Sequence, residues 1–401
     1  MKMGVCSMLK GLLATLQGRL RSALAAVPLA VAALQVVIAF PNQAAASSAS
    51  AASSASGLPQ RGASDTLAGV SCVSRDDCWA VGSTVKANNV VGETLHWNGS
   101  RWVAVPAPAA AGALNSVSCT SSSDCWAVGS VGSWQTLPLV VRWNGASWSK
   151  AQTPNLSGAA LRAATCASPG NCWTVGSAGN NDKTLALQWI GSRWIHVATP
   201  SPGKFGKTLT ALTCTSARNC WSFGYYDGPT VGTDVTGYLI AIHWDGSAWK
   251  QVWTSGPYNG ADVSPDAAVD GVSCTSPDQC LAVGWSSIPG VTTRPLALLW
   301  NGSKWITVKT PNIHDARLYG VDCLSATNCW AVGTSRNPWG SSHSLALRWN
   351  GSRWTTATPP GDASSVTCIS ANDCWAVGST ESTDPSLNLA LHWNGVIWSL
   401  F

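Results

Sequence analysis

One cysteine pattern returns seven times along the chain, and it constrains the fold more than any other feature. The stretch "CVSRDDCWAVGS", residues 72 to 83, holds two cysteines six positions apart. The pairs are Cys72/Cys78, Cys119/Cys125, Cys166/Cys172, Cys214/Cys220, Cys274/Cys280, Cys323/Cys329 and Cys368/Cys374, which leaves only Cys6 unused. Most repeats follow one another at 45 to 49 residues, with one interval of 60. A period of this length is typical of propellers and solenoids.

Each repeat divides into four short segments that have the pattern of β-strands. In the third repeat they read "LRAATC", "CWTVGS", "TLALQWIG" and "SRWIHVATP". Within "LALQW", Leu185, Leu187 and Trp189 alternate with Ala186 and Gln188, which is the period of two expected of a pleated strand. Four strands repeated seven times predict an all-β, seven-bladed β-propeller with four antiparallel strands per blade. A parallel β-helix is the alternative, although its coils are usually much shorter.

Twenty of the 24 tryptophans occupy three fixed positions in the repeat. The positions hold Trp79, Trp126, Trp173, Trp221, Trp330 and Trp375; then Trp97, Trp143, Trp189, Trp244, Trp300, Trp349 and Trp393; then Trp102, Trp148, Trp194, Trp249, Trp305, Trp354 and Trp398. A large ring that recurs at fixed blade positions is most simply packed between neighbouring blades, where it buries much apolar area. We therefore interpret these tryptophans as structural.

Spacing decides among three roles for the cysteine pair. Zinc sites favour cysteines two to four residues apart with further ligands nearby, and no histidine recurs beside these pairs. Thioredoxin-like chemistry needs two intervening residues at the start of a helix. Cysteines that face each other across a hairpin suit a disulfide. We expect one disulfide in each blade, each contributing about 2 kcal/mol, with no metal and no cofactor.

The amino-terminal residues have the features of an export signal. Residues 1–46 combine a basic start, an apolar run from Ala23 to Phe40 and small residues at Ala44 and Ala46, which predicts a cleaved signal peptide. An uncleaved membrane anchor is the alternative. Residues 47–64 form a Ser/Ala-rich linker, and residues 65–401 form the propeller. The expected location is secreted or at the cell surface, where disulfides persist.

Charge excludes one class of partner. Of the 24 basic residues, Lys2, Lys10, Arg19 and Arg21 lie in the signal segment, so 20 basic residues face 19 acidic ones in the rest. A nearly neutral chain has no electrostatic footprint for nucleic acid. We expect an extracellular glycan or protein partner, and a monomer.

The repeat resembles the photosystem II assembly factor-like propellers and, more widely, the Asp-box or sialidase-type superfamily. The likeness is closest at "DCWAVG" (77–82 and 124–129) and "WNGSRW" (97–102 and 349–354), and it covers residues 65–401. It implies the propeller fold. An Asp-box places aspartate in the turn, whereas this chain mostly places asparagine there, as at Asn98 and Asn301, with Asp245 as the exception.

Strand order separates a face of repeated turns from a face of variable loops. The loops from second to third strand and the connections between blades share one face, and variable loops on a rigid scaffold are where ligands tend to bind. Aromatic rings beside Asn and Asp suit a sugar. The predicted ligand-binding residues are Trp134, Tyr225, Tyr226, Asp227, Tyr258, Asn259, Trp285 and Trp339.

The leading functional hypothesis is a secreted, non-catalytic propeller that binds carbohydrate or protein. One alternative is a sialidase-like glycoside hydrolase or lyase, which would need arginine, tyrosine and carboxylate side chains to converge at the channel mouth. The possible arginines are Arg162, Arg294, Arg317 and Arg336. The other alternative is an extracellular assembly scaffold, which would need broad apolar patches.

Three local features carry further expectations. His96, His243 and His392 are expected to be exposed strand residues rather than ligands. Ser264 followed by Pro265 predicts one helical turn in "SPDAAVDG" rather than a calcium site. The last repeat ends early at "WSLF", so residues 57–63 are expected to complete the outer edge of the final blade.

Overall fold

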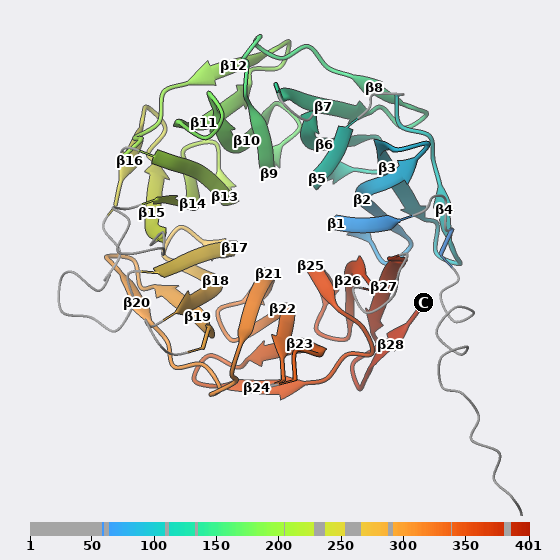
Figure 1. The fold of residues 1–401 in the computed structure, drawn as a ribbon, viewed down its shortest axis with the longest axis vertical. Coiled ribbons are helices and arrows are strands. Elements are labelled where there is room, and N and C mark those ends of the chain that lie inside the picture. The colour runs from blue at the N-terminus through green and yellow to red at the C-terminus, as the bar shows by residue number, and fades with distance from the viewer. Residues whose placement is uncertain are drawn as a thin grey trace, which may run out of the picture. The chain divides into compact units, whose positions relative to one another are not determined.

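The protein folds into a ring of seven four-stranded antiparallel sheets around a central channel (Figure 1). The computed structural model describes residues 58–59, 64–108, 112–132, 135–203, 205–227, 237–252, 266–287, 292–337, 339–380 and 386–401. The predicted seven-bladed propeller is confirmed. The predicted signal peptide and most of the linker lie outside the described residues. Among those residues, no helix has the length and apolar character needed to cross a membrane.

Every blade is built from four strands that follow one another in the sequence. The innermost strands are β1 (Asp65–Ser74), β5 (Gly112–Ser121), β9 (Ala160–Ser168), β13 (Phe205–Ser216), β17 (Asp266–Ser276), β21 (Ala316–Ser325) and β25 (Ala363–Ser370). The second strands are β2 (Asp77–Lys86), β6 (Asp124–Val131), β10 (Asn171–Ala178), β14 (Asn219–Asp227), β18 (Gln279–Ser287), β22 (Asn328–Arg336) and β26 (Asp373–Ser379). The third strands are β3 (Asn89–Trp97), β7 (Leu137–Trp143), β11 (Lys183–Trp189), β15 (Gly237–Trp244), β19 (Arg294–Trp300), β23 (Ser342–Trp349) and β27 (Asn388–Trp393). The outer strands are β4 (Trp102–Ala104), β8 (Trp148–Lys150), β12 (Trp194–Val197), β16 (Trp249–Gln251), β20 (Trp305–Thr307), β24 (Trp354–Ala357) and β28 (Trp398–Leu400).

The repeated "WNG" segment forms the turn between the third and outer strands. The side-chain oxygen of Asn98 accepts hydrogen bonds from the backbone N–H groups of Ser100 and Arg101, both at 3.1 Å. Gly99 has a φ of +88°, a left-handed conformation that glycine adopts without strain. Asp245 makes the same contacts in blade 4. Asparagine and aspartate supply the same acceptor oxygen here, whereas blade 3 forms the turn with Ile190 at this position.

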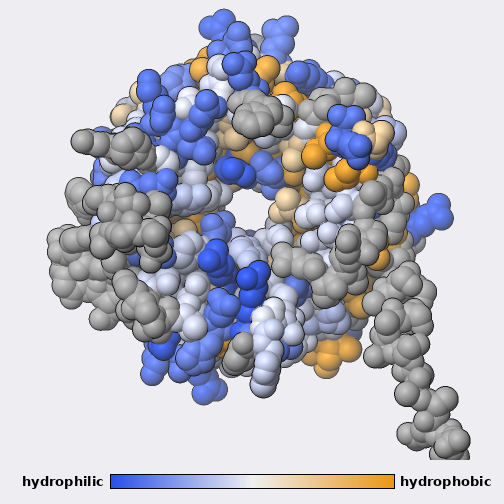
Figure 2. Space-filling model, in the orientation of Figure 1, coloured by the Kyte–Doolittle hydropathy of each residue, from blue (hydrophilic) through white to orange (hydrophobic). Residues whose placement is uncertain are grey.

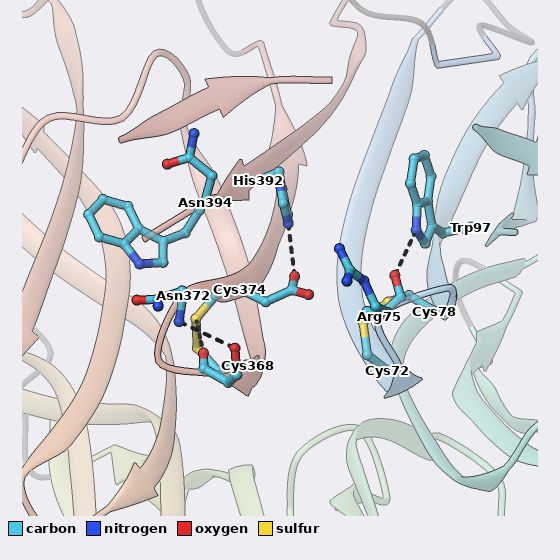
Figure 3. A network of polar contacts seen from close by, with 12 residues as sticks. Cys72, Arg75, Cys78, Trp97, Cys368, Asn372, Cys374, His392 and Asn394 are labelled. Carbon is cyan, nitrogen blue, oxygen red and sulfur yellow. Dashed lines mark hydrogen bonds and ion pairs between the residues drawn. A yellow bond between two sulfur atoms is a disulfide. The ribbon is translucent and has the colours of Figure 1, made fainter. Parts of the chain in front are cut away.

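The seven predicted disulfides are confirmed, one in each blade between the innermost and second strands. Cys72 and Cys78 are direct partners in the register of β1 and β2, 4.0 Å apart at their Cα atoms. The third-strand Trp97 then donates a hydrogen bond from its indole N–H to the carbonyl oxygen of Arg75, at 3.0 Å (Figure 3). Disulfide and indole together fix this turn. We call the side of the ring that carries these turns the disulfide face, and the opposite side the variable face.

The two cysteines of each pair differ in burial. The first cysteine, such as Cys72, is only half-buried near the end of an innermost strand. The second cysteine is at most 3 % exposed, because its strand is covered by a neighbouring strand on each edge and by a blade on each face. Each second cysteine belongs to the apolar cluster at a blade junction: Cys78, Cys125, Cys172, Cys220, Cys280, Cys329 and Cys374. These seven are therefore core residues.

Tryptophan fills the junctions between blades, as predicted. Trp126 of blade 2 lies 4.7 Å from the ring of Trp189 and 5.1 Å, edge to face, from that of Trp194, both in blade 3. Trp126 is almost completely buried. The apolar core is therefore a series of similar clusters, one at each junction, rather than a single central mass.

The three framework histidines are half-buried covers of these rings, so the expectation that they are exposed is wrong. His392 lies 2.8 Å from the Asp373 carboxylate (Figure 3) and 4.6 Å from the ring of Trp375. His96 makes the equivalent contact with Asp77, and His243 contacts Asn219. The polar residue before the second cysteine therefore anchors a ring cover, which explains why Asp or Asn recurs there.

The ends of the described chain meet at the junction of blades 1 and 7 (Figure 1). The outer strand of blade 7 is β28, and of residues 57–63, which are expected to complete that edge, only 58 and 59 are among the described residues. Leu58 is buried in the junction cluster with Leu67 and Trp375. The N–H of Asp65 donates to the carbonyl oxygen of Ser386 at 2.9 Å. Leu58 and the first residue of β1 therefore contribute to this junction.

A second local expectation is also wrong. Asp266–Ser276 forms β17, so the residues after Pro265 continue as an innermost strand rather than a helical turn. The buried residues Ala267 and Val269 hold this segment in the sheet. Burial between two blades thus outweighs the local helix-start signal.

Candidate functional site

A glycine in the second strand of each blade shapes the wall of the channel. A Cβ atom on Gly82 would lie only 1.9 Å from the carbonyl oxygen of Thr66 in the innermost strand. The same approach, at 1.9 to 2.1 Å, occurs at Gly129, Gly176, Gly224, Gly284, Gly333 and Gly378. Only glycine permits this contact, and beside it the innermost strand carries a β-bulge, as between Leu67 and Gly69. The glycine that recurs four positions after the second cysteine is therefore the sequence origin of a bulge in every blade.

Each bulge leaves one extra residue, and all seven of these residues line one cavity of about 180 Å³ in the channel. They are Ala68, Asn115, Arg162, Thr210, Asp270, Tyr319 and Ser364. No two are of the same type, although the surrounding strands repeat closely. Figure 2 shows the channel open at the centre of the ring, with hydrophilic residues along part of its rim. Residues that vary on a repeated scaffold can determine which ligand the protein binds.

The aromatic and charged side chains near the channel come mainly from blades 3 to 6. Tyr225 follows the glycine of blade 4, and Trp285 follows that of blade 5. The other five blades have a small hydroxyl residue at this position, as at Ser83, Ser130, Ser177, Thr334 and Ser379. The guanidinium of Arg317 lies 4.3 Å from the centre of the Trp285 ring, within range of a cation–π contact. Two large rings and an arginine, from blades 4, 5 and 6, thus lie toward the variable face.

These side chains and the charged bulge residues are close enough for charge to affect the pKa of Tyr225 and of Asp270. Burial raises the pKa of Tyr225, and the charge of Arg162 opposes that rise while those of Asp270 and Asp227 add to it. Burial also raises the pKa of Asp270 to about 6, against the opposing charge of Arg317. Arg162 and Asp270 belong to blades 3 and 5, so they flank Tyr225 of blade 4. We call Arg162, Tyr225, Asp270, Trp285 and Arg317 the mouth cluster.

The predicted ligand residues divide into groups. Tyr225 and Trp285 belong to the mouth cluster, and Asp227 lies at the end of β14 close enough to act on Tyr225. Tyr226 points to the other side of β14, where its ring stacks on Tyr238 at 5.2 Å and packs against the core. Trp339 is 88 % exposed in a loop of blade 6. Trp134, Tyr258 and Asn259 lie outside the described residues.

Sequence reasoning missed Asp270 and left Arg162 and Arg317 as two of four possible arginines. Their position in the repeat could have identified them. Arg162 and Asp270 occupy the bulge position of their innermost strands, and Arg317 lies two residues before it. Of the four arginines, Arg162 lines the channel cavity, and Arg317 reaches the mouth cluster through its contact with Trp285. In the described residues, no group of three or more His, Cys, Asp or Glu side chains could hold a metal ion.

Asp270→Asn is expected to stabilise the protein at neutral pH but not in acid. The folded-state pKa of about 6 exceeds the ordinary value of 3.8, so the unfolded chain releases this proton first and stability falls as pH rises through that interval. Asparagine cannot ionise. We expect a gain of about 1 to 2 kcal/mol at about pH 7.5 and none at about pH 4, measured by urea unfolding. A gain independent of pH would contradict the assignment to this carboxyl.

Comparison with known proteins identifies the fold. No family model matches the chain, and no curated protein matches it. It is similar to the solved structure of YCF48 bound to D1 peptide, with 13 % identity over 84 % of this chain and 94 % of that chain, and a TM-score of 0.52. It is also similar to a polysaccharide lyase, an ulvanlyase, with 9 % identity over 86 % and 98 % and a TM-score of 0.56. A GH74 xyloglucanase from Xanthomonas campestris matches at 12 % identity over 83 % of this chain and 59 % of that chain, with a TM-score of 0.51. The resemblance to assembly factor-like and sialidase-type propellers is confirmed at the level of the fold.

Proposed function

We propose that the protein is an exported binding protein that holds a carbohydrate at the mouth cluster. The observation that carries this proposal is the replacement of a small hydroxyl residue by Tyr225 and Trp285 in two adjacent blades, beside Arg162 and Asp270. Aromatic faces pack against the C–H groups of a sugar, and charged groups next to them bond its hydroxyls. Two arginines at one rim also suit a sugar that carries a carboxylate or sulfate.

Export is proposed on two grounds. The seven disulfides fit an oxidising compartment. The basic and apolar pattern of residues 1–46 fits a signal peptide. A partner outside the cell then follows, and a glycan is the class that the mouth cluster favours.

The test is binding of the purified protein to an array of neutral and acidic glycans. Trp285→Ala and Arg162→Ala are each expected to lose the binding signal by about tenfold or more. Arg101→Ala is the matched control, because this arginine is exposed in a turn on the disulfide face and is expected to leave binding unchanged. Binding that is indifferent to both mouth variants would contradict the site. Binding that is lost only in Trp339→Ala would instead place the binding site in the loop of blade 6.

A second candidate function is cleavage of a carbohydrate, as in a glycoside hydrolase or lyase. The convergence of Arg162, Tyr225 and Asp270 favours it, since a carboxyl with a pKa of about 6 and a phenol flanked by charge are candidates for proton transfer. Tyr225→Phe and Asp270→Asn separate the two functions. For an enzyme, these variants would still bind the glycan but release no product. For a binding protein, the wild type releases no product either.

An assembly scaffold is the third possibility and has less support. It calls for a broad apolar patch on the variable face. Among the described residues, the large exposed apolar side chains on that face are Val90, Leu137 and Trp339, which belong to blades 1, 2 and 6. Val90 and Leu137 belong to neighbouring blades and Trp339 to a third, and the described residues of the other blades add no large exposed apolar side chain on this face. A protein recovered on the mouth cluster, with no glycan bound, would favour this reading over the first.

A further inference from the structure

One junction of the ring lacks the tryptophan that fills the others. In six blades the residue after the second cysteine is tryptophan, which packs on two rings of the next blade. Trp221 of blade 4, for example, lies 4.6 Å from Trp300 and 5.2 Å from Trp305. The equivalent residue in blade 5 is Leu281. The ring of Trp349 in blade 6 therefore faces a leucine where every equivalent ring faces an indole.

Two further residues of blade 5 differ from the repeat. In other blades, the residues at these two positions cover the junction tryptophan ring and anchor that cover. In blade 2 the guanidinium of Arg142 lies 5.0 Å from the centre of the Trp126 ring and is anchored on Asp124 at 2.9 Å. The residues equivalent to this pair in blade 5 are Leu299 and Gln279. The other six blades have His, Arg or Gln at the first position and Asp or Asn at the second. Blade 5 has therefore changed the tryptophan ring, the residue that covers it and the residue that anchors the cover, which are Leu281, Leu299 and Gln279 here.

A pocket of about 280 Å³ opens at this place, on the disulfide face between blades 5 and 6. Its lining includes Leu281, Leu299, Trp300 and Trp349, with Asn301 and Thr327 among the polar residues of its rim. Leu281 and Trp349 are 2 % and 3 % exposed, so the floor is apolar and fixed by the surrounding strands. The pocket lies on the opposite face from the mouth cluster. We call it the ring pocket.

We propose that the ring pocket binds a planar aromatic ring of about the size of indole. The occupant is inferred from the protein itself, because six equivalent junctions hold an indole against the third-strand tryptophan of the next blade, and here that tryptophan, Trp349, lines the pocket. Apolar cavities lined by leucine and aromatic side chains stay dry and take up aromatic molecules. Ring-to-ring contacts in offset or edge-to-face geometry add to the burial of apolar area. The polar rim leaves the edge of the bound ring open to solvent, so the ring can be a free molecule or a side chain of a peptide.

The test uses free indole and a short peptide with one tryptophan, followed by calorimetry and ligand-observed NMR on the intact protein. Saturable binding of indole is expected. Leu281→Trp is expected to weaken it by about tenfold or more and to raise the melting temperature, because the side chain fills the pocket. Leu299→Arg is a second blocking variant that restores the cover found in blade 2. Tighter binding of the peptide than of indole would identify a protein side chain as the source, and the reverse would identify a small molecule.

Three outcomes would overturn the proposal. The first is no saturable binding of either probe. The second is binding that survives in both blocking variants while their melting temperatures show them to be folded. The third is preference for a monosaccharide over indole at this site. The double variant Trp126→Leu/Arg142→Leu supplies the converse test, since it removes both ring and cover and should add a second indole site between blades 2 and 3. The mouth variants Trp285→Ala and Arg162→Ala are expected to leave indole binding unchanged, which separates this inference from the proposed function.

Discussion

Trp173→Ala is expected to lower the free energy of unfolding by about 3 to 5 kcal/mol. The indole of Trp173 is fully buried between blades 3 and 4, 4.8 Å from the ring of Trp244 and 5.3 Å from that of Trp249. Alanine would leave a cavity that the blades cannot close, because the adjacent innermost strands are fixed on one another around the ring. The contacts with two further rings would be lost as well.

Urea unfolding followed by circular dichroism measures this effect without relying on the fluorescence of the residue removed. Trp339→Ala is the matched control. Its side chain is 88 % exposed, so we expect a change within about 0.5 kcal/mol. Similar losses in the two variants would contradict the role of Trp173 as a junction residue and would favour a general effect of losing tryptophan.

The architecture could be predicted because its determinants recur with a fixed period. Cys72 and Cys78 lie six residues apart in a hairpin, and a disulfide across two strands needs little more than this spacing. The different burial of the two cysteines could not be read from that spacing, since it depends on the blade that packs over the second strand. The junction tryptophans could be placed because they share the period. The closure of the ring could not, since the sequence of Leu58 and its neighbours matches no repeat and its burial depends on where blades 1 and 7 meet.

The mouth cluster depends on two things that the spacing of residues does not contain. A bulge interrupts the period of two, so Asp270 in "AVDGVSC" points into the channel although simple alternation does not indicate that direction. Arg162, Tyr225 and Asp270 also come from three blades, and only the curvature of the ring brings them together. The change from tryptophan to Leu281, in contrast, is visible in the sequence, but its consequence needs the neighbouring Trp349.

Asn388→Ala is expected to lower the free energy of unfolding by about 2 to 4 kcal/mol at the junction where the ring closes. Glu93 of blade 1 occupies a position at which the other six blades have Leu139, Leu185, Ile240, Leu296, Leu345 and Leu389. Its carboxylate accepts a hydrogen bond from the side-chain amide of Asn388 at 2.8 Å. Both residues are almost completely buried, so alanine at 388 removes a donor from a carboxylate that water does not reach.

The double variant Glu93→Leu/Asn388→Leu tests whether the junction needs the Glu93–Asn388 hydrogen bond, or only needs a buried Glu93 not to lose its donor. It copies the junction of blades 4 and 5, where Leu239 and Leu296 pack in one apolar cluster. Replacing a buried polar pair by apolar side chains is often neutral or stabilising, so we expect the double variant to recover most of the stability lost in Asn388→Ala. A loss as large as that of the single variant would show that the junction needs the polar pair itself. Because the contact between blades 1 and 7 closes the ring, a polar pair there also disfavours pairing with a blade of another chain. We therefore expect the double variant, refolded at high concentration and examined by size-exclusion chromatography, to form more oligomer than the wild type.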